Sequence, residues 1–282
     1  MFADYHVHCE FSDDSREAME AQVQRGIELG LQEICFTDHV DYGIKKDHGE
    51  ADIVYQPIED GQLVPLVNVD YPAYFSQLKK LQERYGDQIT IRKGLEFGIQ
   101  SITIADYQKL FAAYEEELDF VLLSVHQIDN KELWTQDFQK DKTQQEYNED
   151  YYREIYRIQR SFSDYCVLAH LDLIRRYDEQ GEYPFAKVKE LIAEILKLAI
   201  SQDKGIEINT SSWRYGLKDT QPSRVVLELY KDLGGRIITI GSDAHNSRQL
   251  ADHYQDAQRI LKQCGFSQIC CFEKRQPVFY DI

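Results

Sequence analysis

The stretch Asp4-Tyr5-His6-Val7-His8 is the most informative in the chain, because it predicts a β-strand that carries two histidines at its end. Successive side chains of a strand point to opposite faces, so His6 and His8 project the same way and lie a few ångströms apart. One such pair is weak evidence for a metal site. Its weight depends on whether other strands end in the same way.

The same placement recurs along the chain. Ligand-type side chains end or follow apolar, strand-like runs: His39 follows 33–37, Glu96 follows 89–95, His126 follows 119–124, His170 ends 166–170, and Asp243 and His245 follow 236–241. A single histidine after a strand is more often a hydrogen-bonded structural residue. The recurrence instead predicts a metalloenzyme whose ligands gather at the carboxyl ends of parallel strands.

The hydrophobic pattern alternates strands with helices. Besides 2–8 and the runs above, 205–209 is predicted as a strand, and helices are predicted over 15–29, 74–85, 104–116, 142–162, 185–202, 222–233 and 247–264. Seven βα units favour an α/β fold with a parallel barrel, formed as one domain over 1–282. A doubly wound open sheet is the alternative, but no glycine-rich phosphate loop follows the first strand. The tail, 269–272 and 278–280, is expected to be short and extended.

The interval 40–71 is the main irregularity of this pattern. It mixes charged residues with glycines and prolines, and it is too long for a simple connection. Because it follows His39, it leaves the barrel at the end that carries the ligands. Loops of this length are usually functional or disordered, so a lid and a flexible insertion both remain open.

Composition and charge exclude several classes of function. The net charge is -17, with no block of basic residues, which disfavours nucleic acid as a partner. No apolar stretch approaches the length of a membrane span and no signal peptide is expected. Six scattered cysteines without a CxxC pair indicate reduced thiols, and the expected location is the cytoplasm.

Taken together, these motifs resemble those of the polymerase and histidinol phosphatase (PHP) family. The matching segments are Asp4-x-His6-x-His8, Thr37-Asp38-His39, Gly94-Leu95-Glu96, Ser124-Val125-His126, His170-Leu171-Asp172 and Ser242-Asp243-Ala244-His245. The resemblance implies a distorted seven-stranded TIM-like barrel with a trinuclear metal centre. Two further runs, 170–176 and 209–214, look most like those of the histidinol-phosphate phosphatases of histidine biosynthesis.

The resemblance also implies a set of ligands for two to three divalent transition ions, Zn, Mn or Fe. His6 and His8 would bind a first metal together with Glu96 and Asp243, and Glu96 would bridge to a second metal that also takes His126 and His170. A third metal would take His39, His245 and Asp14. Many relatives have a histidine at the position of Asp14, and the aspartate favours Mn or Fe more than an all-histidine site would. Asp13 competes for this role.

Other residues are expected to support the ligands. Asp4 and Asp38 are expected behind the ligands, orienting the first strand and His39, and Asp172 is placed in the same outer layer. Glu96, Asp243 and His245 are the expected catalytic residues.

The expected reaction is hydrolysis of L-histidinol phosphate to L-histidinol and phosphate. Adjacent divalent ions lower the pKa of a bound water, so attack by metal-bound hydroxide without a phosphoenzyme is expected. Hydrolysis of another small phosphate ester or a nucleotide is one alternative, and an inactive metal-binding scaffold is another.

The substrate contacts are predicted by residue type. Arginine suits bidentate phosphate binding, and Arg214 together with Arg175 or Arg176 is expected to bind the phosphate. Asn209 and Trp213 are further candidates for substrate binding. The amine and imidazole of histidinol need a carboxylate and an aromatic surface, for which Asp172, Tyr177, Trp213 and the 40–71 loop remain open.

Overall fold

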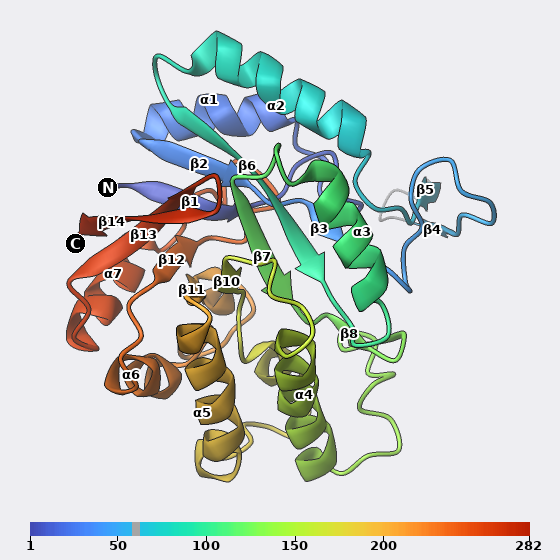
Figure 1. Cartoon of the computed structure of the whole chain (residues 1–282), viewed down its shortest axis with the longest axis vertical. Helices are drawn as coiled ribbons and strands as arrows, with labels where there is room; N and C mark the ends of the chain where they lie inside the picture. The colour runs from blue at the N-terminus through green and yellow to red at the C-terminus, as the bar shows by residue number, and fades with distance from the viewer. Residues whose placement is uncertain (58–62) are drawn as a thin grey trace.

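Seven parallel strands form a nearly closed barrel in the computed structural model, which describes residues 1–57 and 63–282 (Figure 1). In the order of the sheet the strands are β1 (Ala3–Val7), β2 (Glu33–Phe36), β6 (Thr90–Gly98), β7 (Phe120–Ser124), β10 (Val167–Leu168), β11 (Gly205–Asn209) and β12 (Ile238–Gly241). A parallel bridge between Val7 and Ala244 joins the first strand to the last. The predicted α/β barrel is confirmed.

Helices cover the outside of the barrel and alternate with its strands. They are α1 (Met19–Leu29), α2 (Tyr71–Tyr85), α3 (Ile104–Tyr114), α4 (Gln144–Gln159), α5 (Phe185–Ser201), α6 (Arg224–Asp232) and α7 (Tyr254–Gln263). Local sequence sets several ends. Thr143 and Glu146 form a capping box at the start of α4, and Gly30 ends α1 with a φ of 79°.

Several predicted boundaries differ from the structure, and for three of them the described contacts or backbone angles are informative. The last helix begins at Tyr254 instead of 247, because Ala251 and His253 both have a φ of 54°, which no helix accommodates. The first helix begins at Met19 instead of 15, and the Glu10 carboxylate accepts a hydrogen bond from the Met19 amide. β10 ends before His170, whose φ of 26° is incompatible with a strand.

Short strands extend the ligand-bearing end of the barrel. β3 (His39–Val40) pairs with β6 and brings His39 opposite Glu96. Two antiparallel hairpins lie beyond it: β4 (Tyr55–Pro57) with β5 (Leu63–Pro65), and β8 (Gln127–Ile128) with β9 (Lys131–Glu132). The predicted lid, 40–71, contains the first hairpin, which protrudes from the barrel in Figure 1. Its segment 58–62 lies outside the described residues, and the lid stays a prediction.

A C-terminal hairpin, β13 (Gln268–Glu273) with β14 (Gln276–Asp281), packs against the amino end of the barrel. The ring of Phe120 is 5.0 Å from the rings of both Tyr5 and Phe272, and the Phe272 amide donates a 2.6 Å hydrogen bond to the Tyr5 hydroxyl. The predicted extended tail is therefore a paired hairpin. Since this end is filled by apolar side chains, the opposite end is the one open to a ligand.

Among the described residues, no helix combines the length and the apolarity that a membrane span requires.

Replacing Phe272 by alanine should lower the free energy of unfolding by about 3–5 kcal/mol, because the fully buried ring leaves a cavity beside Tyr5 and Phe120. Denaturant titration followed by circular dichroism measures the change. Val278→Ala in β14 is the matched control, since that side chain is 39% exposed and its loss should cost about 0.5 kcal/mol or less. Equal effects of the two changes would contradict the assigned core.

Candidate metal centre

The carboxylate of Glu96 lies at the centre of the ligand-bearing end, and its two oxygens face different histidines. Oε2 is 3.1 Å from Nε2 of His6 and 3.0 Å from Nδ1 of His39. Oε1 is 2.9 Å from Nε2 of His170 and 3.2 Å from Nε2 of His126. Glu96 is fully buried, so this geometry suits a carboxylate that joins two neighbouring metal positions.

The HxH pair converges on the same point from β1. Nε2 of His8 lies 3.3 Å from Oδ1 of Asp243 and 3.5 Å from Glu96, and Nε2 of His6 lies 3.7 Å from the same Asp243 oxygen. Both histidines are fully buried. The two side chains therefore point the same way, as strand alternation predicts.

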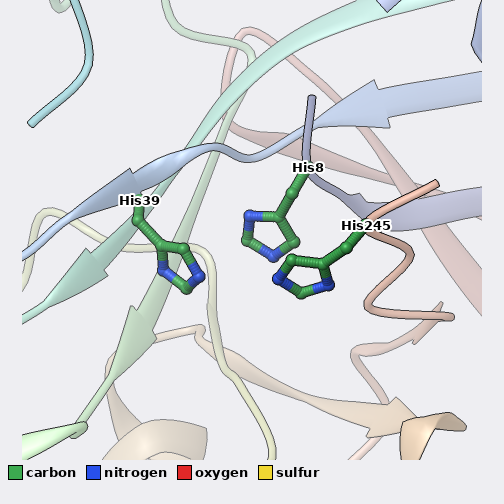
Figure 2. A group of neighbouring side chains, drawn as sticks. All are labelled: His8, His39 and His245. Carbon is green, nitrogen blue, oxygen red and sulfur yellow. The ribbon is translucent and has the colours of Figure 1, made fainter. Parts of the chain in front are cut away.

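A third group forms around Asp14. Its Oδ2 atom lies 2.9 Å from Nε2 of His245 and 3.3 Å from Nε2 of His39. Figure 2 shows the rings of His8, His39 and His245 facing one another from three separate segments. Asp13 instead pairs with a lysine of the 40–71 segment. Of the two aspartates considered for this position, Asp14 is the one that contacts the histidines.

The donor atoms fit divalent transition ions. Four groups of three side chains each bring one donor atom per residue within 4.8 Å: His8, His39 and His245; His6, His8 and Glu96; His39, Asp41 and His126; Glu96, His126 and His170. Imidazole nitrogens mixed with carboxylate oxygens suit Zn, Mn and Fe. Among the described residues, the buried Nε2 of His8 and Nδ1 of His39 lie near carboxylate oxygens but make no well-aligned hydrogen bond, as expected for atoms that bind a metal.

The electrostatics of the group favour a cation at its centre. Burial alone raises the pKa of the Glu96 carboxyl, but His6 and the other histidines outweigh burial and hold it well below its usual range. Burial, with His39 and His245 nearby, lowers the pKa of His8 to about 3. His8 is therefore neutral near pH 7, which is the form of imidazole that binds a metal.

Two carboxylates that the sequence analysis missed hold the histidines from behind. Glu207, in β11, lies 2.6 Å from Nδ1 of His6, and its other oxygen accepts a 2.9 Å bond from the His170 amide. Asp41 lies 2.9 Å from Nδ1 of His126. A carboxylate on the far nitrogen fixes the ring and its tautomer. The signal for Glu207 was present, since a charged residue interrupts the apolar strand 205–209.

The three aspartates expected in this outer layer support the loops more than the rings. Asp4 accepts hydrogen bonds from the amides of Ser242 and Ala251, which fixes the turn after β12. Asp38 accepts a 2.8 Å bond from the Cys9 amide, which fixes the turn after β1. Asp172 accepts from the Ser223 amide and pairs with an arginine. Asp4 also accepts a 3.3 Å bond from the His6 amide, but within the described ranges none of the three aspartates hydrogen-bonds the ring of a candidate ligand histidine.

A cleft of about 510 Å³ lies over the group. Its lining includes the candidate ligands Asp14, His39, Glu96, His126, His170, Asp243 and His245, and also Asp13, Lys45, Gln56, Glu132, Trp134, Arg176, Tyr177 and Tyr215. Arg176 lies 3.6 Å from Oδ2 of Asp243, and its guanidinium stacks 3.9 Å over the ring of Tyr215. Arg176 is thus the arginine that reaches both the cleft and the ligand group.

Four of the candidate substrate contacts lie outside the lining of this cleft: Arg175, Asn209, Trp213 and Arg214. Arg175 pairs with Asp172, Arg214 donates to the carbonyls of Ser242 and Asp243, and the ring of Trp213 lies tilted, 4.7 Å from the ring of His253. Asn209 is buried, and its side chain bonds Ser211 and Glu207. Tyr177 does line the cleft. His48, which the sequence placed in the long loop, does not.

Two of the ligand positions have a backbone conformation that L-residues rarely adopt. The φ angle is 26° at His170 and 54° at Asp243. Such conformations cost about 1–3 kcal/mol each and persist where the surroundings hold them. The His170 amide is held by Glu207, which links the strain to the ligand geometry.

The comparisons with known proteins agree with this geometry. The sequence profile of the PHP domain matches residues 4–211. A histidinol-phosphatase of Lactococcus lactis subsp. lactis is 30% identical over 272 residues, which cover 95% of this chain and 93% of the relative. A probable histidinol-phosphatase of Thermotoga maritima is 28% identical and covers 96% of both chains.

Among solved structures, the histidinol phosphate phosphatase of Lactococcus lactis, complexed with Zn, L-histidinol and phosphate, matches with a TM-score of 0.83. It is 29% identical, and the match covers 98% of both chains. A structure from Listeria monocytogenes, at 18% identity and a TM-score of 0.67, shares the fold.

Glu207→Gln should weaken metal binding about 10- to 100-fold, because His6 loses the charged partner that fixes its ring. Metal content after dialysis against graded chelator measures the effect. Glu228→Gln, an exposed change on α6, is the matched control and should keep the metal. If Glu207→Gln binds metal as tightly as the control, Glu207 does not orient the ligand.

Proposed function

Since the chain belongs to the PHP family, we propose that it is a metal-dependent histidinol-phosphatase that hydrolyses L-histidinol phosphate to L-histidinol and phosphate. One observation carries the proposal. Over 98% of its length the chain shares the fold of a phosphatase that binds Zn, L-histidinol and phosphate, and its own His and Glu groups converge beneath a cleft.

The proposed ligand sets follow the contacts of Glu96. His6, His8 and Asp243 form one set with Glu96, and His126 and His170 form the second with the same carboxylate. His39, His245 and Asp14 form a third set. Divalent ions held there supply Lewis-acid charge to the phosphate and lower the pKa of water. Two to three ions of Zn, Mn or Fe are proposed.

The chain's own residues orient the phosphate and the ligands. Arg176 is fixed by bonds from its guanidinium to Ser211 Oγ (2.6 Å) and Gln221 Oε1, so it is oriented before a substrate arrives. We assign it to a phosphate oxygen, because its Nη1 atom takes no part in these bonds and a charged N–H group binds phosphate strongly. Asp243 and His245 carry donor atoms at the floor of the cleft, and Glu96 joins the sets beneath them.

Purified, metal-replete protein should hydrolyse L-histidinol phosphate with a kcat/KM at least about 100-fold above that for p-nitrophenyl phosphate, since selectivity requires contacts beyond the phosphate. Phosphate release from a panel of small phosphomonoesters measures this ratio. Exhaustive chelation should abolish the activity, and adding back a divalent ion should restore it. Equal rates across the panel would contradict the assignment of L-histidinol phosphate as the substrate, but not the assignment as a metal-dependent phosphatase.

Arg176→Ala should lower kcat/KM about 10- to 100-fold for every phosphomonoester, because it removes a charged hydrogen bond to the common phosphate. It should also weaken inhibition by inorganic phosphate by a similar factor. Arg175→Ala is the matched control, since its guanidinium pairs with Asp172 and Glu182 away from the cleft. An unchanged inhibition constant for phosphate in Arg176→Ala would contradict the assignment.

A further inference from the structure

Two residues at the rim of the cleft have no part in the metal groups or in phosphate binding. Glu132 and Trp134 follow β7 and line the cleft. The indole N–H of Trp134 donates a 3.0 Å hydrogen bond to Oε1 of Glu132, while Trp134 itself is 59% exposed. An exposed aromatic side chain that lines a cleft is a candidate for contact with the ligand.

The hairpin that carries Glu132 is rigidly held. Its turn residues Asp129 and Asn130 have φ angles of 53° and 58°, as a tight two-residue β-turn requires. Gln100 accepts a 2.6 Å bond from the Asn130 amide and donates a 2.9 Å bond to its side chain. The Leu133 amide donates to the His126 carbonyl. Glu132 is therefore fixed relative to a metal ligand, which favours selective binding.

The charge around Glu132 differs from the charge around Arg176. Glu132 lies near Asp13, Asp41 and Lys45, and partial burial, with Asp41 and Asp13 nearby, raises the pKa of its carboxyl against the opposing effects of Trp134 and Lys45. Three carboxylates and one ammonium give this side of the cleft a formal charge of -2 (-3 plus +1). The phosphate would be repelled here, and a cationic nitrogen would be attracted.

Lys45 does not neutralise this region by itself. Its side chain is only 9% exposed, and its ammonium pairs with Asp13 and with Asp41, at 3.0 Å from the latter. Asp41 is in turn committed to His126. Among the described residues, hydrogen bonds and ion pairs engage both oxygens of Asp13 and both oxygens of Asp41, whereas Glu132 is engaged through Oε1.

We infer that Glu132 and Trp134 form the subsite for the leaving group: Glu132 accepts a hydrogen bond from a cationic nitrogen, and the Trp134 indole covers the adjoining ring. The inference rests on the proposed function and adds to it the residues that set specificity. An amino alcohol with an aromatic ring fits both halves of the pair, whereas a nucleotide, with further anionic groups, does not.

The test separates leaving-group binding from chemistry. Glu132→Gln should lower kcat/KM for L-histidinol phosphate about 10- to 100-fold, while the value for p-nitrophenyl phosphate stays within about twofold. L-Histidinol should inhibit p-nitrophenyl phosphate hydrolysis about tenfold more weakly, and inorganic phosphate should inhibit as before. Trp134→Leu should weaken L-histidinol binding and leave O-phosphoethanolamine, which has no ring, unchanged.

Matched variants control for folding and for general effects. Glu182→Gln changes an exposed carboxylate outside the cleft lining, and Trp213→Leu changes the tryptophan that contacts His253. Both should keep the selectivity of the wild type. Metal content and the circular dichroism spectrum should be the same in all four variants.

The outcomes distinguish the inference from the proposed function. If the wild type shows no preference for L-histidinol phosphate, the proposed function fails. If the wild type is selective and Glu132→Gln keeps the same selectivity, the subsite is overturned while the function stands. A parallel loss for both substrates in Glu132→Gln also overturns it, because the residue would then act through the metal centre.

Discussion

The buried carboxylate of Glu96 is the interaction on which this structure depends. A fully buried charge is costly unless it is paired and hydrogen-bonded, and Glu96 meets this requirement with histidines from β1, β3 and the segments after β7 and β10. Each partner comes from a different part of the chain. The barrel brings all of these partners to one point. The pairing of Glu96 therefore requires the complete barrel.

The amino end of the barrel is apolar and its carboxyl end is polar, and the packing of the first stabilises the geometry of the second. At the amino end, the β13–β14 hairpin packs aromatic rings against Tyr5 and fills the interior. At the carboxyl end, Glu207 and Asp41 fix the far nitrogens of His6 and His126, and the strained backbone at His170 is held in place. A rigid apolar base allows a polar group to be held in one geometry, because the side chains behind it cannot relax.

The residues proposed to bind metal and those proposed to select the substrate belong to different parts of the fold. The ligands come from strand ends, whose positions the sheet fixes, whereas the rim of the cleft comes from the 40–71 segment, the β8–β9 hairpin and the loops after β10 and β11. Loops can vary without disturbing the barrel. A common phosphoryl-transfer site can therefore be combined with different rims, and the acidic, aromatic rim of this chain suits a cationic, ring-bearing leaving group.

The sequence alone indicated seven alternating strands and helices, favoured a barrel, and picked out the histidines that now surround Glu96, because period-two and period-3.6 patterns report burial and because parallel strand ends must meet at one edge. Only the tertiary structure decided which loop side chains reach the cleft. Arg175, Arg176 and Arg214 were equivalent as residue types, but Arg214 turns to the carbonyls of Ser242 and Asp243, and Arg176 enters the cleft. Trp134 lines the cleft and Trp213 does not, and Glu207 is distant in sequence from the His6 ring it holds. Side-chain direction in irregular segments depends on contacts between residues far apart in the chain, and no local pattern encodes it.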